Sequence, residues 1–143
     1  MNRVALLLLA ACTMGGLVSA GRSAAQNQAK PYVVQDDKVD SHVYNGYRRY
    51  GESCLRCHGP DGAGSSYAPS LVDSLKSMSE QQFDEVVVNG KQDVNQASDK
   101  VMPAFGTVED VVIYLKDIYA YLKARSDGAL GRGRPVRIGD DAG

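Results

Sequence analysis

The segment Cys54-Leu55-Arg56-Cys57-His58 constrains the fold more than any other part of this sequence. Two thiols stand three positions apart, and an imidazole follows directly. At a helix end, such thiols can reach the two vinyl groups of one porphyrin and form thioether bonds, while the imidazole faces the iron. The segment therefore predicts one covalently bound haem c, attached through both cysteines, with His58 as an axial iron ligand.

Two other chemistries use cysteines at this spacing. A structural zinc site needs about four ligands, usually with a second pair of cysteines or histidines, and the sequence offers no such pair. A redox-active dithiol would stand in a β-α-β context, which the pattern of apolar residues does not indicate. We therefore favour haem attachment over both alternatives.

The first 25 residues are typical of a secretory signal peptide. Arg3 precedes an apolar run from Val4 to Val18, and small residues follow it. Cleavage after Ala25 would leave Gln26 as the first mature residue, and cleavage after Ala20 is the alternative. We expect a soluble periplasmic protein.

A lipoprotein is the competing interpretation of the N-terminus. The segment Leu9-Ala10-Ala11-Cys12 resembles a lipobox, at which bacterial lipoproteins are cut and acylated on the cysteine. In that case the protein would be anchored to the membrane through Cys12. The apolar run continues past Cys12 to Val18, which favours removal of Cys12 with the signal.

The charge of the mature chain excludes one class of partner. Removing residues 1–25 takes away Arg3 and Arg22 and no acidic residue, so the formal net charge falls from −1 to −3. A nucleic-acid-binding domain normally carries a strongly basic surface. We therefore expect no nucleic-acid partner.

The rest of the chain divides into three parts. An extended N-terminal arm covers residues 26–40, a domain that would bind the haem covers 41–127, and a Gly/Arg-rich tail covers 128–143. The composition of the tail is as typical of a disordered, solvated segment as of a docking segment.

The domain is predicted to be all-α. The first helix begins at Asp40 or Ser41, either of which can cap it, and the capping box Ser79 to Gln82 opens a helix that ends at Gly90. The other predicted segments are a loop over 59–70, a short helix over 71–78, an irregular stretch over 91–106, and a last helix opened by Thr107 with Asp110 and ended by Gly128. Four helices in about 118 mature residues form a marginal core, which a haem would complete.

Met102 is the predicted second axial ligand. It precedes Pro103 in an irregular segment, where the backbone can bring a thioether to the iron and the rigid proline restricts the loop. Ligation by histidine and methionine is usual in small electron-transfer cytochromes. Met78 suits core packing instead, and His42 suits the surface or a helix cap.

The spacing before the haem segment resembles that of the class I cytochromes c. In that family, a glycine, an aromatic residue and the first haem cysteine stand four positions apart, as Gly46, Tyr50 and Cys54 do. The resemblance implies the class I cytochrome c fold, with three to four helices around one haem. It also implies that the C-terminal helix crosses closely at the glycine, with Ile118 and Tyr121 on the matching face.

The same resemblance suggests a role for Pro69. The family has a proline two residues before a leucine, and the proline carbonyl accepts a hydrogen bond from the axial histidine. Pro69-Ser70-Leu71 fits this pattern. The resemblance therefore implies that Pro69 fixes the orientation of the His58 imidazole.

Further segments resemble the c-type cytochromes of methanol metabolism, such as cytochrome cL; they are residues 68–75, 87–90, 102–106, 120–125 and 128–135. The resemblance implies a one-electron carrier rather than an enzyme. It would accept electrons from an alcohol dehydrogenase of the methanol type that uses pyrroloquinoline quinone (PQQ), and pass them to another cytochrome or an oxidase; the resemblance includes the partners of both lanthanide-dependent dehydrogenases and other methanol dehydrogenases. A haem peroxidase or a ligand sensor is the alternative, and it would need an open sixth position on the iron.

Overall fold

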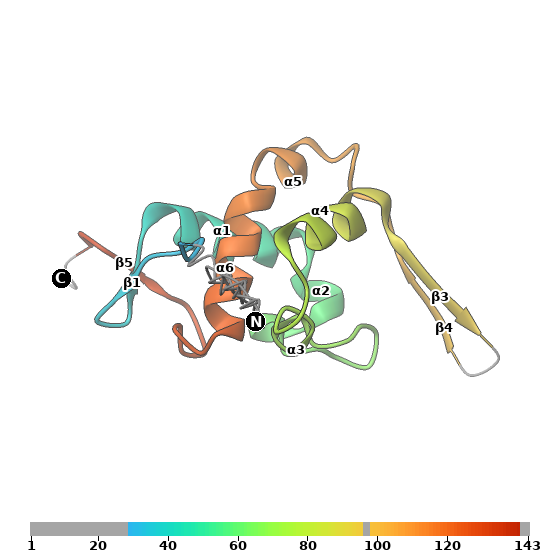
Figure 1. Cartoon of the computed structure of the whole chain (residues 1–143), viewed down its shortest axis with the longest axis horizontal. Helices are drawn as coiled ribbons and strands as arrows, with labels where there is room; N and C mark the ends of the chain where they lie inside the picture. The colour runs from blue at the N-terminus through green and yellow to red at the C-terminus, as the bar shows by residue number, and fades with distance from the viewer. Residues whose placement is uncertain (1–28, 96–97, 141–143) are drawn as a thin grey trace, which may run out of the picture.

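The computed structural model describes residues 29–95 and 98–140 of the chain. These residues form short helices joined by loops, with two small sheets at opposite ends (Figure 1). The α-helices are α1 Ser41–Ser53, α2 Leu55–His58, α3 Leu71–Ser74, α4 Glu80–Asn89, α5 Glu109–Ile113 and α6 Leu115–Ser126, with a 3-10 turn, η1, at Pro60–Gly62. The strands are β1 Val34–Gln35, β2 Lys38–Val39, β3 Lys91–Asn95, β4 Ser98–Met102 and β5 Val136–Arg137.

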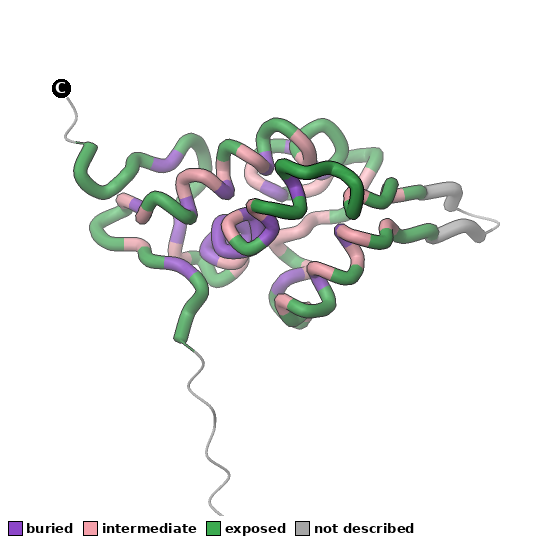
Figure 2. Tube along the Cα trace, turned by 90° about the horizontal axis from the view of Figure 1, so that it is seen from above, coloured by how far each residue is buried: buried purple, intermediate pink, exposed green. Residues whose placement is uncertain are grey.

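The packing of α1 against α6 forms the centre of the molecule. Buried residues gather there, and exposed residues cover both ends (Figure 2). Gly46 of α1 faces the backbone of Asp117 and Ile118 in α6 so closely that a Cβ atom on it would overlap the Asp117 carbonyl. Beside this crossing, the rings of Tyr50 and Tyr121 lie 5.6 Å apart. The close helix crossing expected at Gly46 is therefore present.

Most predicted helix ends are where the sequence placed them. Asp40 caps α1 by accepting a hydrogen bond from Val43 N at 2.8 Å. The capping box of α4 is complete, because Ser79 and Gln82 each accept a hydrogen bond from the other's backbone. Gly128 follows the end of α6 with a left-handed φ of +71°, a conformation that favours glycine.

The last predicted helix is divided in two. Tyr114 has φ −105° and ψ 19°, and it separates α5 from α6. The predicted cap at Thr107 is wrong, because α5 begins after Val108 and has no side-chain cap. The spacing of apolar residues did not reveal this division, because the buried residues Val111 and Leu115 keep a helical separation of four across the break.

The segment predicted to be irregular after α4 is a β-hairpin. β3 and β4 pair antiparallel, with Lys91 opposite Met102. The hairpin projects away from the helices (Figure 1). A strand that leaves the body has no face to bury, so the sequence lacks the alternation that predicts strands.

The arm and the tail join in one small sheet. β1 and β2 pair antiparallel through a turn at Asp36 and Asp37, which both have positive φ, and β2 pairs parallel with β5. In the tail, Leu130 and Pro135 are buried. The tail therefore packs on the domain, whereas its composition alone was equally typical of a solvated segment.

In the ranges that the structure describes, no helix has both the length and the apolar character needed to cross a membrane.

Candidate haem-binding site

Cys54, Cys57 and His58 lie at the junction of α1 and α2, on one face of a single helical turn. The backbone N–H groups of Cys57 and His58 both donate to Cys54 O, at 3.1 and 3.0 Å. This is a helical turn, and residues three and four apart share one helix face. Both thiols are free, with Cys54 half-buried and Cys57 exposed. One flat ligand can therefore meet both sulfurs and the imidazole from the same side.

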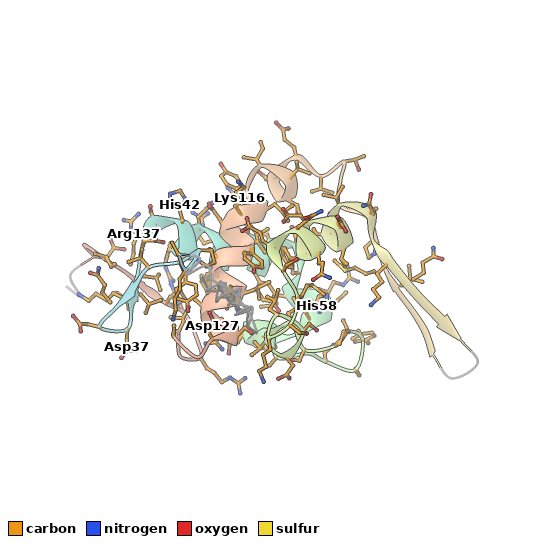
Figure 3. All side chains as sticks on the ribbon, in the orientation of Figure 1. Asp37, His42, His58, Lys116, Asp127 and Arg137 are labelled. Carbon is orange, nitrogen blue, oxygen red and sulfur yellow. The ribbon has the colours of Figure 1, made fainter. Side chains whose placement is uncertain are left out.

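His58 is buried, and one side of its ring is already occupied. Its Nδ1 lies 3.0 Å from the carbonyl oxygen of Pro69. Because a carbonyl only accepts, this contact places the ring proton on Nδ1 and leaves the lone pair of Nε2 for a metal. Figure 3 shows His58 on α2, on the side of the molecule where α3 and α4 also lie.

The loop after the haem segment fixes the backbone of that segment. Gly64 N–H donates to His58 O at 2.8 Å, and the Ser65 hydroxyl donates to Cys57 O at 2.5 Å. The buried Tyr50 hydroxyl donates to the carbonyl of Gly59. These bonds hold the backbone of α2, which carries Cys57 and His58, against the loop that follows it.

The environment of Cys54 differs from that of a redox-active cysteine. Burial, assisted by the neighbouring Cys57, raises the pKa of the Cys54 thiol to about 11. Redox-active thiols instead have a lowered pKa, because the thiolate is the reacting form. This argues against the redox dithiol considered from the sequence.

Met102 lies at the end of β4, and the end of α4 holds the segment that follows it. Phe105 and Gly106 donate backbone hydrogen bonds to the carbonyls of Val87 and Val88, at 2.9 and 3.0 Å. The half-buried Met102 side chain packs against the hydrophobic core, as the side chains of Met78 and Cys54 also do. Packing alone does not distinguish the two methionines, so Met102 stays a predicted ligand.

These residues fit haem c in the chemistry of their donor atoms. Two free thiols share a face with a buried histidine that has one ring nitrogen committed to Pro69 and the other available. A family model described as cytochrome c oxidase, cbb3-type, subunit III, matches residues 42–122, which include the haem segment. The chain belongs to the c-type cytochromes.

Three similar proteins support the assignment of this chain to the c-type cytochromes. It is 50% identical over 108 residues to cytochrome c-553I of Paracoccus denitrificans, a match that covers 76% of this chain and 48% of that protein. It is 40% identical to cytochrome c-555 of Methylococcus capsulatus over 66% of this chain and 72% of that one. The crystal structure of the c-type cytochrome XoxG from Methylobacterium extorquens is similar, with a TM-score of 0.65, 43% identity, and coverage of 77% of this chain and 74% of that chain.

These comparisons settle the class of this cytochrome. The fold is that of a class I cytochrome c, the cofactor is covalently bound haem c, and the family consists of electron-transfer proteins. The resemblance to the c-type cytochromes of methanol metabolism is confirmed. The chain spans about half the length of the Paracoccus relative.

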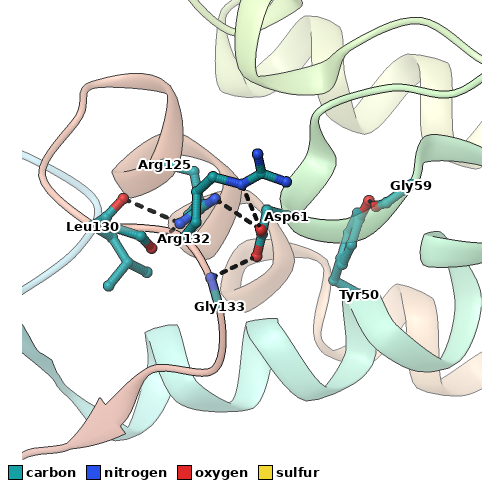
Figure 4. A network of polar contacts seen from close by, with 8 residues as sticks. Tyr50, Gly59, Asp61, Arg125, Leu130, Arg132 and Gly133 are labelled. Atoms are coloured by element: carbon teal, nitrogen blue, oxygen red, sulfur yellow. Dashed lines mark hydrogen bonds and ion pairs between the residues drawn. The ribbon is translucent and has the colours of Figure 1, made fainter.

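Sequence reasoning missed one polar cluster beside the site. The carboxylate of Asp61, in η1, contacts Arg125 of α6 and both Arg132 and Gly133 of the tail (Figure 4). The sequence carries almost no signal for this cluster, because Asp61 is far in the chain from Arg125 and Arg132 and no motif relates them.

Proposed function

We propose that this cytochrome is a periplasmic one-electron carrier between a PQQ-dependent alcohol dehydrogenase and a downstream cytochrome or oxidase. The observation that carries the proposal is the site at α2. There, two free thiols share a helix face with a histidine whose Nδ1 is bound to Pro69 O.

Each site residue has a proposed role. Cys54 and Cys57 would form the thioether bonds to the haem, His58 would bind the iron through Nε2, and Met102 would supply a sulfur ligand. Pro69 holds the His58 ring in one orientation through its carbonyl. When bound, haem c would supply reversible one-electron chemistry.

The proposed donor is an alcohol dehydrogenase of the methanol type. Support comes from the likeness to XoxG and to the cytochromes of Paracoccus denitrificans and Methylococcus capsulatus. Contacts with the donor should be small and quickly broken, because a carrier must meet its donor and its acceptor in turn. Arg56, exposed between the two haem cysteines, is a candidate contact residue.

Mixing experiments test the donor directly. A reduced PQQ-dependent dehydrogenase of the methanol type is mixed with the oxidised cytochrome in a stopped-flow instrument, and haem reduction is followed by absorbance. We expect rapid reduction that slows as salt screens charged contacts. Rapid reduction by an unrelated donor, with none by the dehydrogenase, would leave only a general electron carrier.

Covalent attachment has an independent test. Extraction of the denatured protein with acidified organic solvent should leave the haem on the polypeptide, because thioether bonds survive denaturation. A Cys54→Ala, Cys57→Ala double variant should release it. Haem found in the solvent from the wild type would refute covalent attachment at this segment.

The location is tested at the N-terminus. The predicted signal peptide, residues 1–25, and Cys12 lie outside the described residues. We propose cleavage after Ala25 and a soluble product in the periplasm. Mass spectrometry of the mature protein should find Gln26 first, whereas an acylated Cys12 would identify a lipoprotein.

A further inference from the structure

Asp61 lies three residues after the haem segment, and its carboxylate contacts residues of α6 and of the C-terminal tail. Its Oδ2 lies 3.1 Å from Arg132 Nε and 3.4 Å from Arg125 Nη2, and its Oδ1 accepts a 3.0 Å hydrogen bond from Gly133 N–H. We call these four residues the tail clamp. The Asp61 side chain is only 11% exposed. Figure 4 shows that the helix and the tail converge on this one carboxylate.

Arg125 ties the clamp to the first turn of the tail. Its side chain is 5% exposed, and its guanidinium donates to the carbonyls of Leu130, at 3.3 Å, and Gly131. Because one guanidinium bridges these carbonyls and Asp61, the path of the tail and the position of the loop depend on each other. Arg132 lies outside this buried part, with 76% of its side chain exposed.

A short chain of contacts connects the clamp to His58. Gly64, in the same loop as Asp61, donates to His58 O at 2.8 Å. Gly64 also lies so close to Pro69 and Ser70 that a Cβ atom on it would come within 2.7 Å of Ser70 N. The Pro69 carbonyl is the group that His58 Nδ1 faces. The loop thus lies between the tail and the hydrogen-bond acceptor of His58.

Asp61 is ionised in this setting. Burial alone would raise the pKa of its carboxyl, but the Gly133 N–H and the two arginines outweigh burial and lower that pKa below its ordinary value. The clamp therefore joins a carboxylate to two cations over a wide range of pH.

We propose that the tail clamp positions the haem ligand: by holding the loop against Pro69, it maintains the hydrogen bond that His58 donates. This inference rests on the proposed binding of iron by His58. A hydrogen bond to its outer nitrogen makes an imidazole more basic, and a more basic ligand favours ferric over ferrous iron. Loosening the clamp should therefore raise the reduction potential.

The sign of the change at Arg132 separates positioning from simple charge. Arg132→Gln removes a positive charge near the site, and charge alone would then favour ferric iron and lower the reduction potential. Loss of positioning changes the potential in the opposite direction. The exposure of Arg132 makes misfolding of this variant a minor concern, because exposed substitutions usually change stability little.

Limited proteolysis of the holoprotein measures the clamp without any haem signal. Trypsin cleavage after Arg132, followed by mass spectrometry, reports opening of the tail. We expect Asp61→Asn to accelerate cleavage about tenfold, the ratio that corresponds to about 1.4 kcal/mol in the opening equilibrium. The control Asp140→Asn breaks another pair in the same tail, Arg137 with Asp140 at 2.8 Å, and should leave this cleavage unchanged.

Spectroelectrochemistry of the same holoproteins completes the test. Arg132→Gln should raise the reduction potential above that of the wild type, and Asp140→Asn should not change it. The proposal is overturned if Arg132→Gln lowers the potential or leaves it unchanged, or if Asp61→Asn frees the tail without altering the potential. Neither measurement involves the dehydrogenase, so an error about the donor would not affect them.

Discussion

Two glycines of α1 stand in opposite environments. A Cβ atom on Gly46 would overlap the Asp117 carbonyl and lie 3.0 Å from Ile118 N, whereas one on Gly51 would meet nothing within 4 Å. The missing side chain at Gly46 is what allows α1 and α6 to cross closely. At Gly51 the missing side chain only adds freedom to the unfolded chain.

Alanine substitutions at these glycines should therefore have opposite effects. Gly46→Ala should lower the free energy of unfolding by about 2–3 kcal/mol, because the helix backbones must separate. Gly51→Ala should raise it by about 0.5–1 kcal/mol, the ordinary gain of alanine over glycine within a helix. Urea unfolding followed by circular dichroism measures both values. Equal effects would show that the crossing is looser than the structure indicates.

The two half-buried methionines allow a matched test of the axial ligand. Met102→Ala should abolish the weak near-infrared band of sulfur bound to ferric iron and lower the reduction potential, because a thioether stabilises ferrous iron. Met78→Ala should keep the band and lose only packing energy. Optical spectra of the oxidised variants decide between them, and the reverse result would identify Met78 as the ligand.

At the scale of elements, α4 connects the core to the segment that carries Met102. Its residue Phe83 is buried against Tyr119 of α6, with ring centroids 5.4 Å apart. Its last residues accept the hydrogen bonds of Phe105 and Gly106. Fraying of this helix should therefore affect both the core and the position of the Met102 segment.

The N-terminal cap of α4 can be removed by one substitution. Ser79 Oγ accepts from Gln82 N at 3.2 Å, and Gln82 Oε1 accepts from Ser79 N at 2.9 Å. Ser79→Ala should cost about 1 kcal/mol of stability, the usual value for a lost cap. Ser77→Ala, at an exposed residue just before the cap, should change stability by less than about 0.5 kcal/mol. Thermal unfolding of the two variants side by side checks the difference, which would vanish if the cap did not contribute.

Across the whole fold, carboxylates hold the described parts of both the arm and the tail. Asp61 holds the tail, and Asp127 holds the arm by accepting from Tyr32 OH at 2.9 Å while pairing with Lys123 at 2.6 Å. Burial would raise the pKa of Asp127, but its bonds to Lys123 and Tyr32 outweigh burial and lower it. Because Asp61 pairs with Arg125 and Asp127 pairs with Lys123, protonating both carboxylates should weaken contacts in the last turn of the central helix α6.

Stability should therefore fall in acid. For a carboxyl whose pKa is lowered by folding, the stabilisation is complete above the unfolded pKa of about 3.9 and is lost as the pH falls through the lower folded pKa. Urea unfolding as a function of pH should show this loss below about pH 4. An Asp61→Asn, Asp127→Asn double variant should show a weaker dependence, and the exposed Asp140→Asn control should keep the wild-type slope. An unchanged slope in the double variant would assign the acid sensitivity to other groups.

The features that could be predicted are those that depend on residues close together in the sequence. The haem segment and the caps at Asp40 and Ser79 each involve groups within a few positions, whose geometry is set by one helical turn. The close crossing at Gly46 was expected only from the family resemblance, because its partner Asp117 is distant in the sequence. Tertiary structure decided the features whose partners are distant. The break at Tyr114 and the projecting hairpin leave no periodic signal. The tail packs on the domain because folding brings Asp61 next to Arg132, although the two residues are 71 positions apart in the sequence.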